Sequence, residues 1–395
     1  MERELAHIER IHNIQPIEGA DNIDKAKVLG WDLIVKKGEF QEGDLCVFFE
    51  VDSKLPKADW SEFLEKRDYK VKIYKLGKFG VWSEGLALPI SSIPQLNGKA
   101  LTEGQGVTEL LGVVYSVQED NIRKKGDPDA KYKSMSARNK KLFQKKPFRW
   151  LMKRTWGKKL LFFFFGRKKD SPKGFPDWIK RSDENRVEGM PWILGNGKVY
   201  DVSEKANGCS SSYGLKRLKK GKNKYEFFVC SRNVRLNDPE QETYHEQTKQ
   251  RQQQKYNIYW FNAFKYNIQE HLTKYMNAHP ELDWVYIQGE SVGSVQGNPY
   301  KLTEDDLYVF NFVTNTEGRW PSPKGKELIE SWGMKWVPLL GTATIPADME
   351  ELKLFADGKS VINPKVDREG LVYRGLDGQE SFKNVSRKYL LKHQQ

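Results

Sequence analysis

The sequence predicts an α+β protein in which a small β-barrel is followed by a mixed α+β domain. Three observations carry this prediction. Short apolar or alternating segments, separated by Gly, Asn and Asp, recur through residues 1–115, a pattern typical of a barrel. The periodicity ends over 116–172, where lysine and arginine predominate. Strand patterns return over 173–395 around a helical stretch. We therefore expect a barrel domain, a basic linker or insertion, and a second domain with these bounds.

The first domain is expected to consist of short strands with turns between them. The expected strands lie within 7–11, 25–36, 45–51, 69–74 and 85–89, with turns at 19–22, 38 and 43–44. An OB-type barrel is the interpretation we favour, and such barrels normally bind an oligonucleotide or an oligosaccharide. The alternative is a barrel that only packs against its neighbour.

The basic segment carries most of the chain's charge. Residues 121–169 contain 18 Lys and Arg but 2 Asp and Glu, a net charge of +16; since the whole chain carries +13, the rest carries −3. Such a segment can track phosphates, and its aromatic residues favour contact with bases or with the protein body. A solvated linker is the alternative.

Composition excludes several classes of protein. No apolar run approaches the roughly 20 residues of a membrane-spanning helix, and the N-terminus lacks a secretory signal pattern. The three cysteines, Cys46, Cys209 and Cys230, are too few and too widely spaced for a four-cysteine zinc site. They favour a reducing compartment, so we expect a cytoplasmic protein, or one in the host cytoplasm if the source is viral.

The second domain is expected to be α+β, with its apolar residues in both strand and helix periods. Residues 255–277 have helical spacing on one apolar face, which ends before Pro280, and 182–184 resemble a helix start. Strands are expected at 213–218, 225–231, 284–287, 307–313, 371–373 and 381–382.

The most informative stretch is Glu204-Lys205-Ala206-Asn207-Gly208, which follows an alternating strand. A lysine at the mouth of a strand, followed by a turn-forming Asn-Gly, can be held rigidly beside a pocket. Lysine amines act as covalent nucleophiles when their pKa is lowered. Alone, the pattern is more typical of an exposed lysine before a hairpin turn. Further motifs follow in order: Ser231-Arg232-Asn233, Gln288-Gly289-Glu290, 306–311, Arg368-Glu369-Gly370-Leu371-Val372 and Ser381-Phe382-Lys383.

This order and spacing resembles the covalent nucleotidyltransferases, the superfamily of polynucleotide ligases and mRNA capping enzymes. The resemblance implies an ATP-grasp-like nucleotidyltransferase domain over 173–395 and a role for each matched residue. Lys205 would be the nucleophile that takes AMP, and Asn207 and Gly208 would belong to its nucleotide-binding motif. Glu204 would hydrogen-bond the adenine amino group, Phe310 would stack on adenine, and Arg232 would contact ribose or phosphate. Glu290 would contact ribose or metal, Glu369 would bind the metal, and Lys383 would bind the α-phosphate and assist catalysis.

The implied chemistry suits these residue types. Attack on the α-phosphate of ATP needs a neutral amine, and the cations near Lys205, which are Lys383 and a divalent metal, would depress its pKa. They would also neutralise charge on the phosphate and the departing pyrophosphate. Carboxylates are natural ligands for Mg²⁺. Taken singly, Glu290, Glu369, Phe310 and Lys383 each fit an ordinary surface or core position.

The position of the barrel indicates which branch of the superfamily the chain resembles. DNA ligases and capping enzymes place an OB domain after the nucleotidyltransferase domain, whereas only 12 residues follow Lys383 here. Three cysteines also cannot supply the zinc finger of NAD-dependent DNA ligases. The N-terminal barrel, with the sequences of 14–21, 35–39 and 175–186, resembles the RNA ligases typified by the Deinococcus enzyme. The chain departs from that family in its long basic segment and in having Asn207 where many ligases have Asp; whether Lys388 joins Lys383 at the phosphate stays open.

The resemblance implies an ATP-dependent RNA ligase that uses Mg²⁺ or Mn²⁺. It would form a lysyl-AMP, move AMP to an RNA 5′-phosphate and join that end to a 3′-OH, with nicks in a duplex as the favoured substrate and a monomer as the favoured state. A DNA ligase or a capping guanylyltransferase is the alternative within the superfamily. A non-catalytic RNA-binding protein is the alternative from another class.

Overall fold

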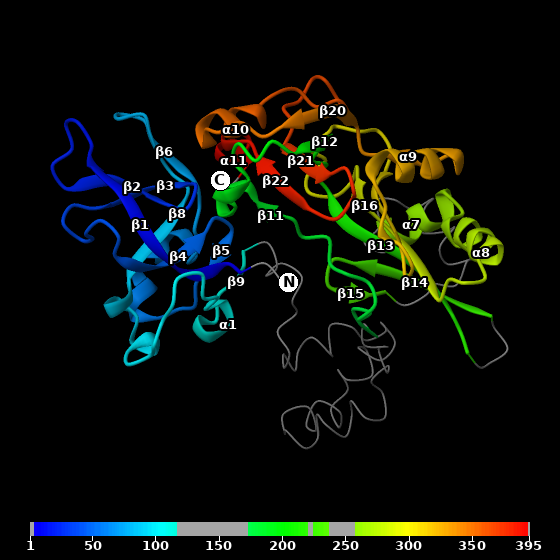
Figure 1. Cartoon of the computed structure of the whole chain (residues 1–395), viewed down its shortest axis with the longest axis horizontal. Coiled ribbons are helices and arrows are strands. Elements are labelled where there is room, and N and C mark those ends of the chain that lie inside the picture. The colour runs from blue at the N-terminus through cyan, green and yellow to red at the C-terminus, as the bar shows by residue number, and fades with distance from the viewer. Residues whose placement is uncertain (1–3, 117–172, 220–223, 237–256, 394–395) are drawn as a thin grey trace, which may run out of the picture. The chain divides into compact units, whose positions relative to one another are not determined.

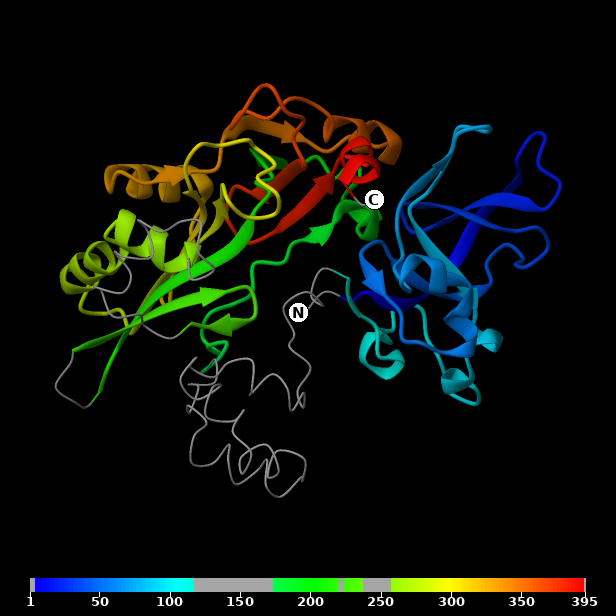
Figure 2. The ribbon, with the colours of Figure 1, turned by 180° about the vertical axis from the view of Figure 1, so that it is seen from behind.

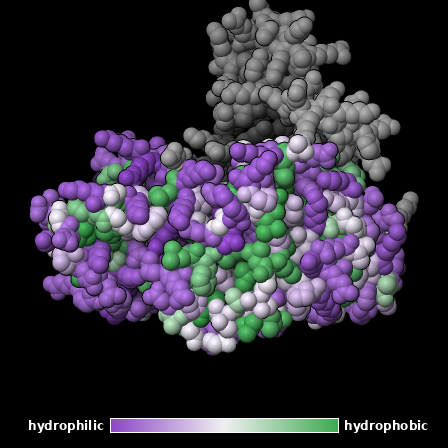
Figure 3. Space-filling view, turned by 90° about the horizontal axis from the view of Figure 1, so that it is seen from above, coloured by the Kyte–Doolittle hydropathy of each residue, from purple (hydrophilic) through white to green (hydrophobic). Residues whose placement is uncertain are grey.

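The computed structural model describes residues 4–116, 173–219, 224–236 and 257–393 (Figure 1). The expected basic segment, 121–169, lies outside the described residues. None of the helices in the described part of the chain is both long and apolar enough to cross a bilayer. The face seen in Figure 3 is hydrophilic over most of its area, with apolar residues gathered in a band across its middle.

The N-terminal domain is a curled antiparallel sheet of short strands. Its strand order is β3-β2-β1-β4-β8, with bounds Trp31–Lys36, Ile23–Val28, Ala6–Pro16, Leu45–Glu50 and Gly85–Pro89. Two small pairs accompany it, β5 (Ser53–Lys54) with β9 (Val114–Tyr115) and β6 (Tyr74–Leu76) with β7 (Val81–Ser83), together with α1 (Thr108–Leu111). A backbone hydrogen bond of 2.8 Å from Glu84 to the Asp32 carbonyl joins the two edges of the main sheet.

This hydrogen bond draws β3 toward the loop that precedes β8 and so curls the sheet toward a barrel. The apolar side chains that alternate along the strands fill the interior, with Trp31 and Phe48 fully buried at its centre. The expected barrel architecture is therefore observed.

The strand expected at 69–74 was wrong for most of its length. Tyr69, Val71 and Ile73 are buried in alternation, which produced the strand pattern, but the ladder begins only at Tyr74. Before it, Lys54 and Lys70 form an isolated bridge, and Asp68 and Tyr69 have left-handed backbones with φ of 53° and 59°. The segment is extended against the core without a neighbouring strand along most of its length.

The C-terminal domain contains two sheets. The first has the order β10-β15-β14-β13-β16-β17-β18, and β19 pairs in parallel with β17. The bounds are β10 Lys173–Gly174, β13 Cys209–Arg217, β14 Tyr225–Ser231, β15 Val234–Arg235, β16 Trp284–Val292, β17 Asp306–Thr314, β18 Gly318–Arg319 and β19 Lys335–Trp336. Helices α7 (Ile258–Lys265), α8 (Ile268–Ala278) and α9 (Ser322–Ser331) belong to this half of the domain, and residues of all three share its core.

The second sheet has the order β11-β22-β21-β12-β20, and β22, β21 and β12 lie side by side in both views (Figure 1, Figure 2). The bounds are β11 Asn185–Arg186, β12 Val199–Glu204, β20 Leu339–Thr344, β21 Gly370–Gly375 and β22 Ser381–Val385. Helix α10 (Met349–Phe355) packs its Met349 and Leu352 on this sheet, and α11 (Arg387–His393) follows β22. Short 3-10 turns lie at Asp59–Arg67, Ile90–Ser92, Pro94–Leu96, Val187–Gly189 and Pro191–Ile193.

Two helix predictions were wrong in detail. The described part of the stretch expected at 255–277, residues 257–277, forms two helices, because Asn267 adopts a left-handed conformation (φ 46°) that ends α7 before α8 begins. No helix starts at 182–184. There the carboxylates form tertiary ion pairs, Asp183 with Arg232 at 2.6 Å and Glu184 with Arg319 at 3.2 Å, instead of capping a helix.

Candidate active site

Lys205 lies where the chain passes from one sheet of the C-terminal domain to the other. Strand β12 of the second sheet ends at Glu204, and β13 of the first sheet begins at Cys209. The backbone N–H of Lys205 donates to the Gly370 carbonyl at 3.0 Å. Its Nζ donates to Glu369 Oε1 at 2.7 Å, and both side chains are largely buried, with exposed fractions of 24% and 17%. The residues at 204–208 therefore form a rigid crossover.

Asn207 and Gly208 fix this crossover in place. The Asn207 N–H donates to the Tyr300 hydroxyl at 2.8 Å, and its side-chain amide donates to the Tyr389 hydroxyl on α11. Gly208 is required by a close approach, since a Cβ at this position would lie 2.2 Å from the Ser291 carbonyl oxygen. The Asn-Gly pair is thus packed between β16, a loop and the last helix, and is not an exposed hairpin turn.

Glu290 is a half-buried carboxyl on β16, opposite Ser210 of β13. Burial raises its pKa to about 8, and the negative charge of Glu369 adds to the rise. The positive charges of Lys205 and Arg232 and the N–H of Gly208 oppose the rise. Four other residues that the sequence motifs singled out therefore act on Glu290, and the five together are spread over 165 residues.

The Glu204 carboxylate is fully buried and already holds two hydrogen bonds. Ser360 Oγ and the Val361 N–H donate to its two oxygens, each at 2.6 Å. A carboxylate offers about four lone-pair positions, so each oxygen retains capacity for a further donor such as an amino group. Sequence reasoning missed the loop that carries Ser360, because nothing local connects it to a residue 156 positions earlier.

Phe310 is the extra residue of a β-bulge. The pairing passes from Gly289 opposite Val309 to Gln288 opposite Asn311, which leaves Phe310 between them. Its ring is half-buried at the border of the core, and its carbonyl accepts from Arg374 Nη1 at 2.7 Å. A bulge of this kind re-aims side chains beside a site, and it leaves no signature in an alternating strand pattern.

Tyr308 is a second aromatic candidate that the sequence reasoning missed. It lies directly opposite Glu290 in the β16–β17 pairing and is half-buried. Burial raises the pKa of its hydroxyl, and the charge of Glu204 contributes to the rise, while Lys335 opposes it. Tyr308 therefore lies opposite Glu290 and within electrostatic reach of Glu204.

Arg232 and Lys383, the two remaining basic residues of the sequence motifs, have different surroundings. Arg232 pairs with Asp183 at 2.6 Å while its charge also acts on Glu290. Lys383 is half-buried on β22 and stands in a cross-strand row with Val372 of β21 and Ser203 of β12. Residues of one row share a face of the sheet, so Lys383 is on the face of Ser203, about 10 Å away from it across two strand spacings.

Lys388 does not extend this row. It is a surface residue of α11, 77% exposed, and its Nζ pairs with Asp357 Oδ2 at 2.9 Å. Within the described residues, the phosphate role expected from the last motif therefore has only Lys383 as its candidate on this strand.

The donor set fits a divalent cation held jointly with a ligand. No group of three or more His, Cys, Asp or Glu that could hold a metal occurs among the described residues. Glu290 and Glu369, however, are close enough for the charge of one to raise the pKa of the other, and a cation between them would relieve that repulsion. Mg²⁺ commonly takes one or two carboxylates and completes its shell with water and phosphate oxygens, so two protein carboxylates suffice.

Comparison with known protein families finds two family models that match parts of this chain. The family model described as RNA ligase matches residues 198–390, and an OB-fold domain model matches residues 5–90. Residues 198–390 thus match the RNA ligase family. The resemblance inferred from the motif order is thereby confirmed, as is the fold class, an N-terminal OB-fold domain with a curled antiparallel sheet followed by an α+β ligase domain.

Solved structures of one RNA ligase, from Naegleria gruberi, are similar over the whole chain. The structure with PPi has 28% identity and a TM-score of 0.72, with 99% of each chain covered. A variant of that ligase with ATP and Mn has 27% identity and a TM-score of 0.71, covering 99% of this chain and 98% of that one. Another variant, with AMP and Mn, has 26% identity and a TM-score of 0.69, with 99% of each covered. A search of curated proteins found no match.

Proposed function

We propose that this RNA ligase is ATP-dependent and works through a lysyl-AMP formed on Lys205, with which it repairs nicks in RNA. The observation that carries the proposal is the position of Lys205 Nζ, which is held at a rigid crossover 2.7 Å from the Glu369 carboxylate and within the electrostatic reach of Glu290. The ATP and AMP complexes of the similar Naegleria gruberi ligase support the choice of nucleotide.

In the first step the Lys205 amine attacks the α-phosphorus of ATP. The nitrogen lone pair forms a P–N bond, the P–O bond to the β-phosphate breaks, and its electron pair leaves with pyrophosphate. The amine must give up a proton, and Glu369 Oε1 is already the acceptor of its hydrogen bond. Lys383, on the same sheet face as Ser203, would lie against the phosphates, and Arg232 against the ribose or phosphate.

Glu290 and Glu369 would hold the Mg²⁺ or Mn²⁺ ion, which supplies charge neutralisation at the phosphates when bound. Glu204 would accept from the adenine amino group with the capacity left beside Ser360 and Val361. Phe310 would stack on the base. Asn207 and Gly208 would keep the crossover in the conformation that presents Lys205.

In the second and third steps the RNA ends react. A 5′-phosphate oxygen attacks the AMP phosphorus, the P–N bond breaks, and Lys205 regains its proton. The 3′-OH then attacks the activated 5′-phosphate, releases AMP and leaves a phosphodiester. We propose nicked duplex RNA as the substrate, a monomer in the cytoplasm as the working form, and domain bounds of 1–115, 116–172 and 173–395.

Radiolabelled nucleotide tests the proposal. With ATP and Mg²⁺ or Mn²⁺, the wild type should become labelled. Lys205→Ala should not, while Lys274→Ala, a change at an exposed lysine of α8, should label normally. Labelling by GTP in place of ATP would favour a capping guanylyltransferase. Equal sealing of nicks with a ribose or a deoxyribose at the 3′ side would favour a DNA ligase, and no labelling with either nucleotide would contradict the lysyl-AMP mechanism.

A further inference from the structure

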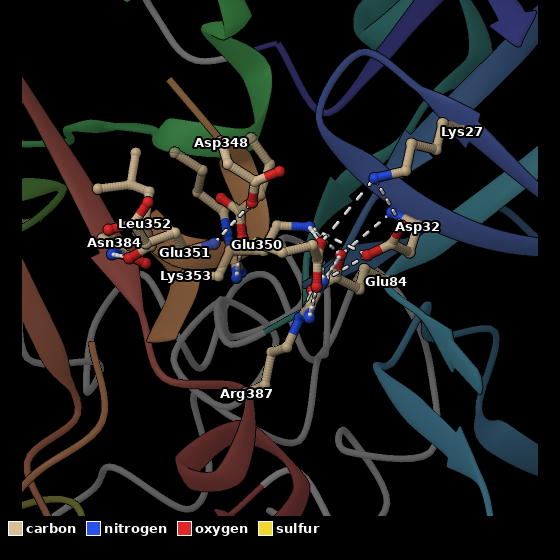
Figure 4. Close-up of polar contacts among 12 residues, drawn as sticks. Lys27, Asp32, Glu84, Asp348, Glu350, Glu351, Leu352, Lys353, Asn384 and Arg387 are labelled. Carbon is tan, nitrogen blue, oxygen red and sulfur yellow. Dashed lines mark hydrogen bonds and ion pairs between the residues drawn. The ribbon is translucent and has the colours of Figure 1, made fainter. Parts of the chain in front are cut away.

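A cluster of six charged residues with a buried centre joins the OB-fold domain to the ligase domain (Figure 4). We call it the interdomain charge cluster. Its members are Lys27, Asp32 and Glu84 of the OB-fold domain and Glu350, Lys353 and Arg387 of the ligase domain. Three cations face three carboxylates, so the cluster is neutral as a whole.

Glu84 is at the centre of the cluster and only 1% exposed. Its carboxylate accepts from Lys353 Nζ at 2.6 Å and from Arg387 Nε and Nη2 at 2.5 and 2.9 Å. Asp32 also contacts both cations, and it is the residue whose backbone closes the barrel edge with Glu84. The contact between the two domains therefore forms where the two edges of the barrel sheet meet.

Neither domain could bury its share of the charges alone. Lys353 is as buried as Glu84. Without the OB-fold domain the ion pairs of Lys353 and Arg387 would be reduced to those with Glu350, with the charge of Glu188 also acting on Lys353. Removing one partner from a buried charge network leaves an uncompensated charge, and that penalty exceeds the net gain of forming the network. The cluster thus strongly favours one docked arrangement and disfavours partial separation.

Backbone and apolar contacts continue the same interface. The Gly30 N–H donates to the Glu188 carbonyl at 2.8 Å, and a Cβ on Gly30 would lie 2.9 Å from that oxygen and 2.5 Å from the methyl carbon of Met349. Val385 and Leu390, at the end of β22 and in α11, are buried within the core cluster of the OB-fold domain. The interface is therefore packed as well as ion-paired.

Helix α11 links this interface to the crossover that carries Lys205. Arg387 at its first position is held by Glu84, and two residues later the Tyr389 hydroxyl accepts from the Asn207 side chain. Ser386, just before the helix, donates its N–H to the Glu369 carbonyl at 2.9 Å, and its Oγ accepts from the Tyr389 N–H at 3.1 Å. The short helix thus contacts the OB-fold domain through Arg387 and Leu390 and the active site through Tyr389.

We infer that the OB-fold domain positions the nucleophile through α11: Glu84 and Arg387 fix the helix, and Tyr389 fixes Asn207 beside Lys205. This inference rests on the proposed function and adds positioning residues to it. It assigns the OB-fold domain a part in lysine adenylylation, a step whose reactants all bind to the ligase domain. None of Glu84, Arg387 and Tyr389 needs to touch ATP for this.

The test compares the single-turnover rate of AMP-adduct formation at saturating ATP with the KM for ATP. Glu84→Gln and Tyr389→Phe should each slow the adduct rate about ten- to a hundredfold, the range for misplacement of a reacting group by around an ångström, with KM within about twofold of wild type. Gly30→Ala should do the same by forcing the domains apart without removing a charge. Glu62→Gln and Gly77→Ala, at an exposed carboxylate and a glycine with open space around it in the same domain, are the matched controls.

A double variant separates positioning from general damage. Glu84→Gln with Tyr389→Phe should be no slower than the slower single variant, because both changes act on one helix, whereas independent effects at distant sites would multiply. Folded variants with the wild-type adduct rate, or rates that multiply, would overturn the inference. If Glu84→Gln does not fold, Gly30→Ala with Tyr389→Phe takes its place. Failure of the wild type to form any adduct would instead contradict the proposed function.

Discussion

Lys205 is in a resting contact in this structure. Its Nζ is the donor and Glu369 Oε1 the acceptor at 2.7 Å, whereas attack on phosphorus uses the nitrogen lone pair. A carboxylate beside the amine provides a place for the departing proton, and the same carboxylate is a candidate ligand for the cation.

Phe310 and Tyr308 are the two candidates for stacking on the adenine base, and substitutions should distinguish them. Phe310→Ala should raise the KM for ATP about five- to hundredfold, since a stacked base is worth about 1–3 kcal/mol, and Phe310→Tyr should retain most of the affinity. The measurement is the ATP dependence of adduct formation. An unchanged KM and rate in Phe310→Ala, together with a raised KM in Tyr308→Ala, would transfer the stacking role to Tyr308, which lies opposite Glu290.

His7 of the OB-fold domain should make stability depend on pH. Burial alone would lower the pKa of its imidazole, but Glu50 and Glu9 outweigh it and raise the pKa from 6.5 to about 9. The stabilisation is fully present below pH 6.5 and is lost as pH rises through 9, up to about 3 kcal/mol in total. Denaturant unfolding from pH 6 to 9.5 should show the difference between wild type and His7→Gln shrinking over that window; a difference independent of pH would contradict the paired, protonated His7.

At the scale of elements, the crossover between β12 and β13 depends on a glycine. Gly208→Ala would place a Cβ 2.2 Å from the Ser291 carbonyl oxygen, so β16 or the crossover must shift. We expect a loss of about 1–3 kcal/mol of stability, typical of overpacking, and slower adduct formation. Gly174→Ala, where no atom of the described residues lies within 4 Å of the added carbon, is the control. Equal behaviour of the two variants in thermal unfolding and labelling would argue against the close approach.

The sequence predicted those elements whose pattern is local. The strands at 225–231 and 371–373 were found because their apolar residues and flanking turns are contiguous, and both are present. The split of 255–277 was missed because it depends on the left-handed backbone of one asparagine. The bulge at Phe310 was missed because it exists only relative to β16.

At the scale of the whole molecule, the motif order predicted which residues meet but not what holds them. Lys205 and Glu369 are 164 residues apart and do make contact. Tyr389, which holds Asn207 across 182 residues, carries no motif. The interdomain charge cluster was also missed, because charged residues at helix and strand ends look solvated until a partner domain buries them.

The basic segment should act on RNA and not on ATP. Deleting 121–169 removes a net charge of +16, so affinity for a nicked RNA duplex should fall and its salt dependence should flatten, since fewer counterions are released. Lysine adenylylation should persist, because none of its proposed residues lies in the segment. Affinities measured at several salt concentrations decide the matter: parallel slopes with equal affinities would rule out phosphate tracking.

The most direct test of the central claim is peptide mass spectrometry of the protein after incubation with ATP and Mn²⁺. The account predicts one AMP per chain, attached to the side-chain nitrogen of Lys205, and its removal when RNA with a 5′-phosphate end is added. AMP on another residue, or ligation of RNA by a Lys205→Ala variant starting from ATP, would contradict it.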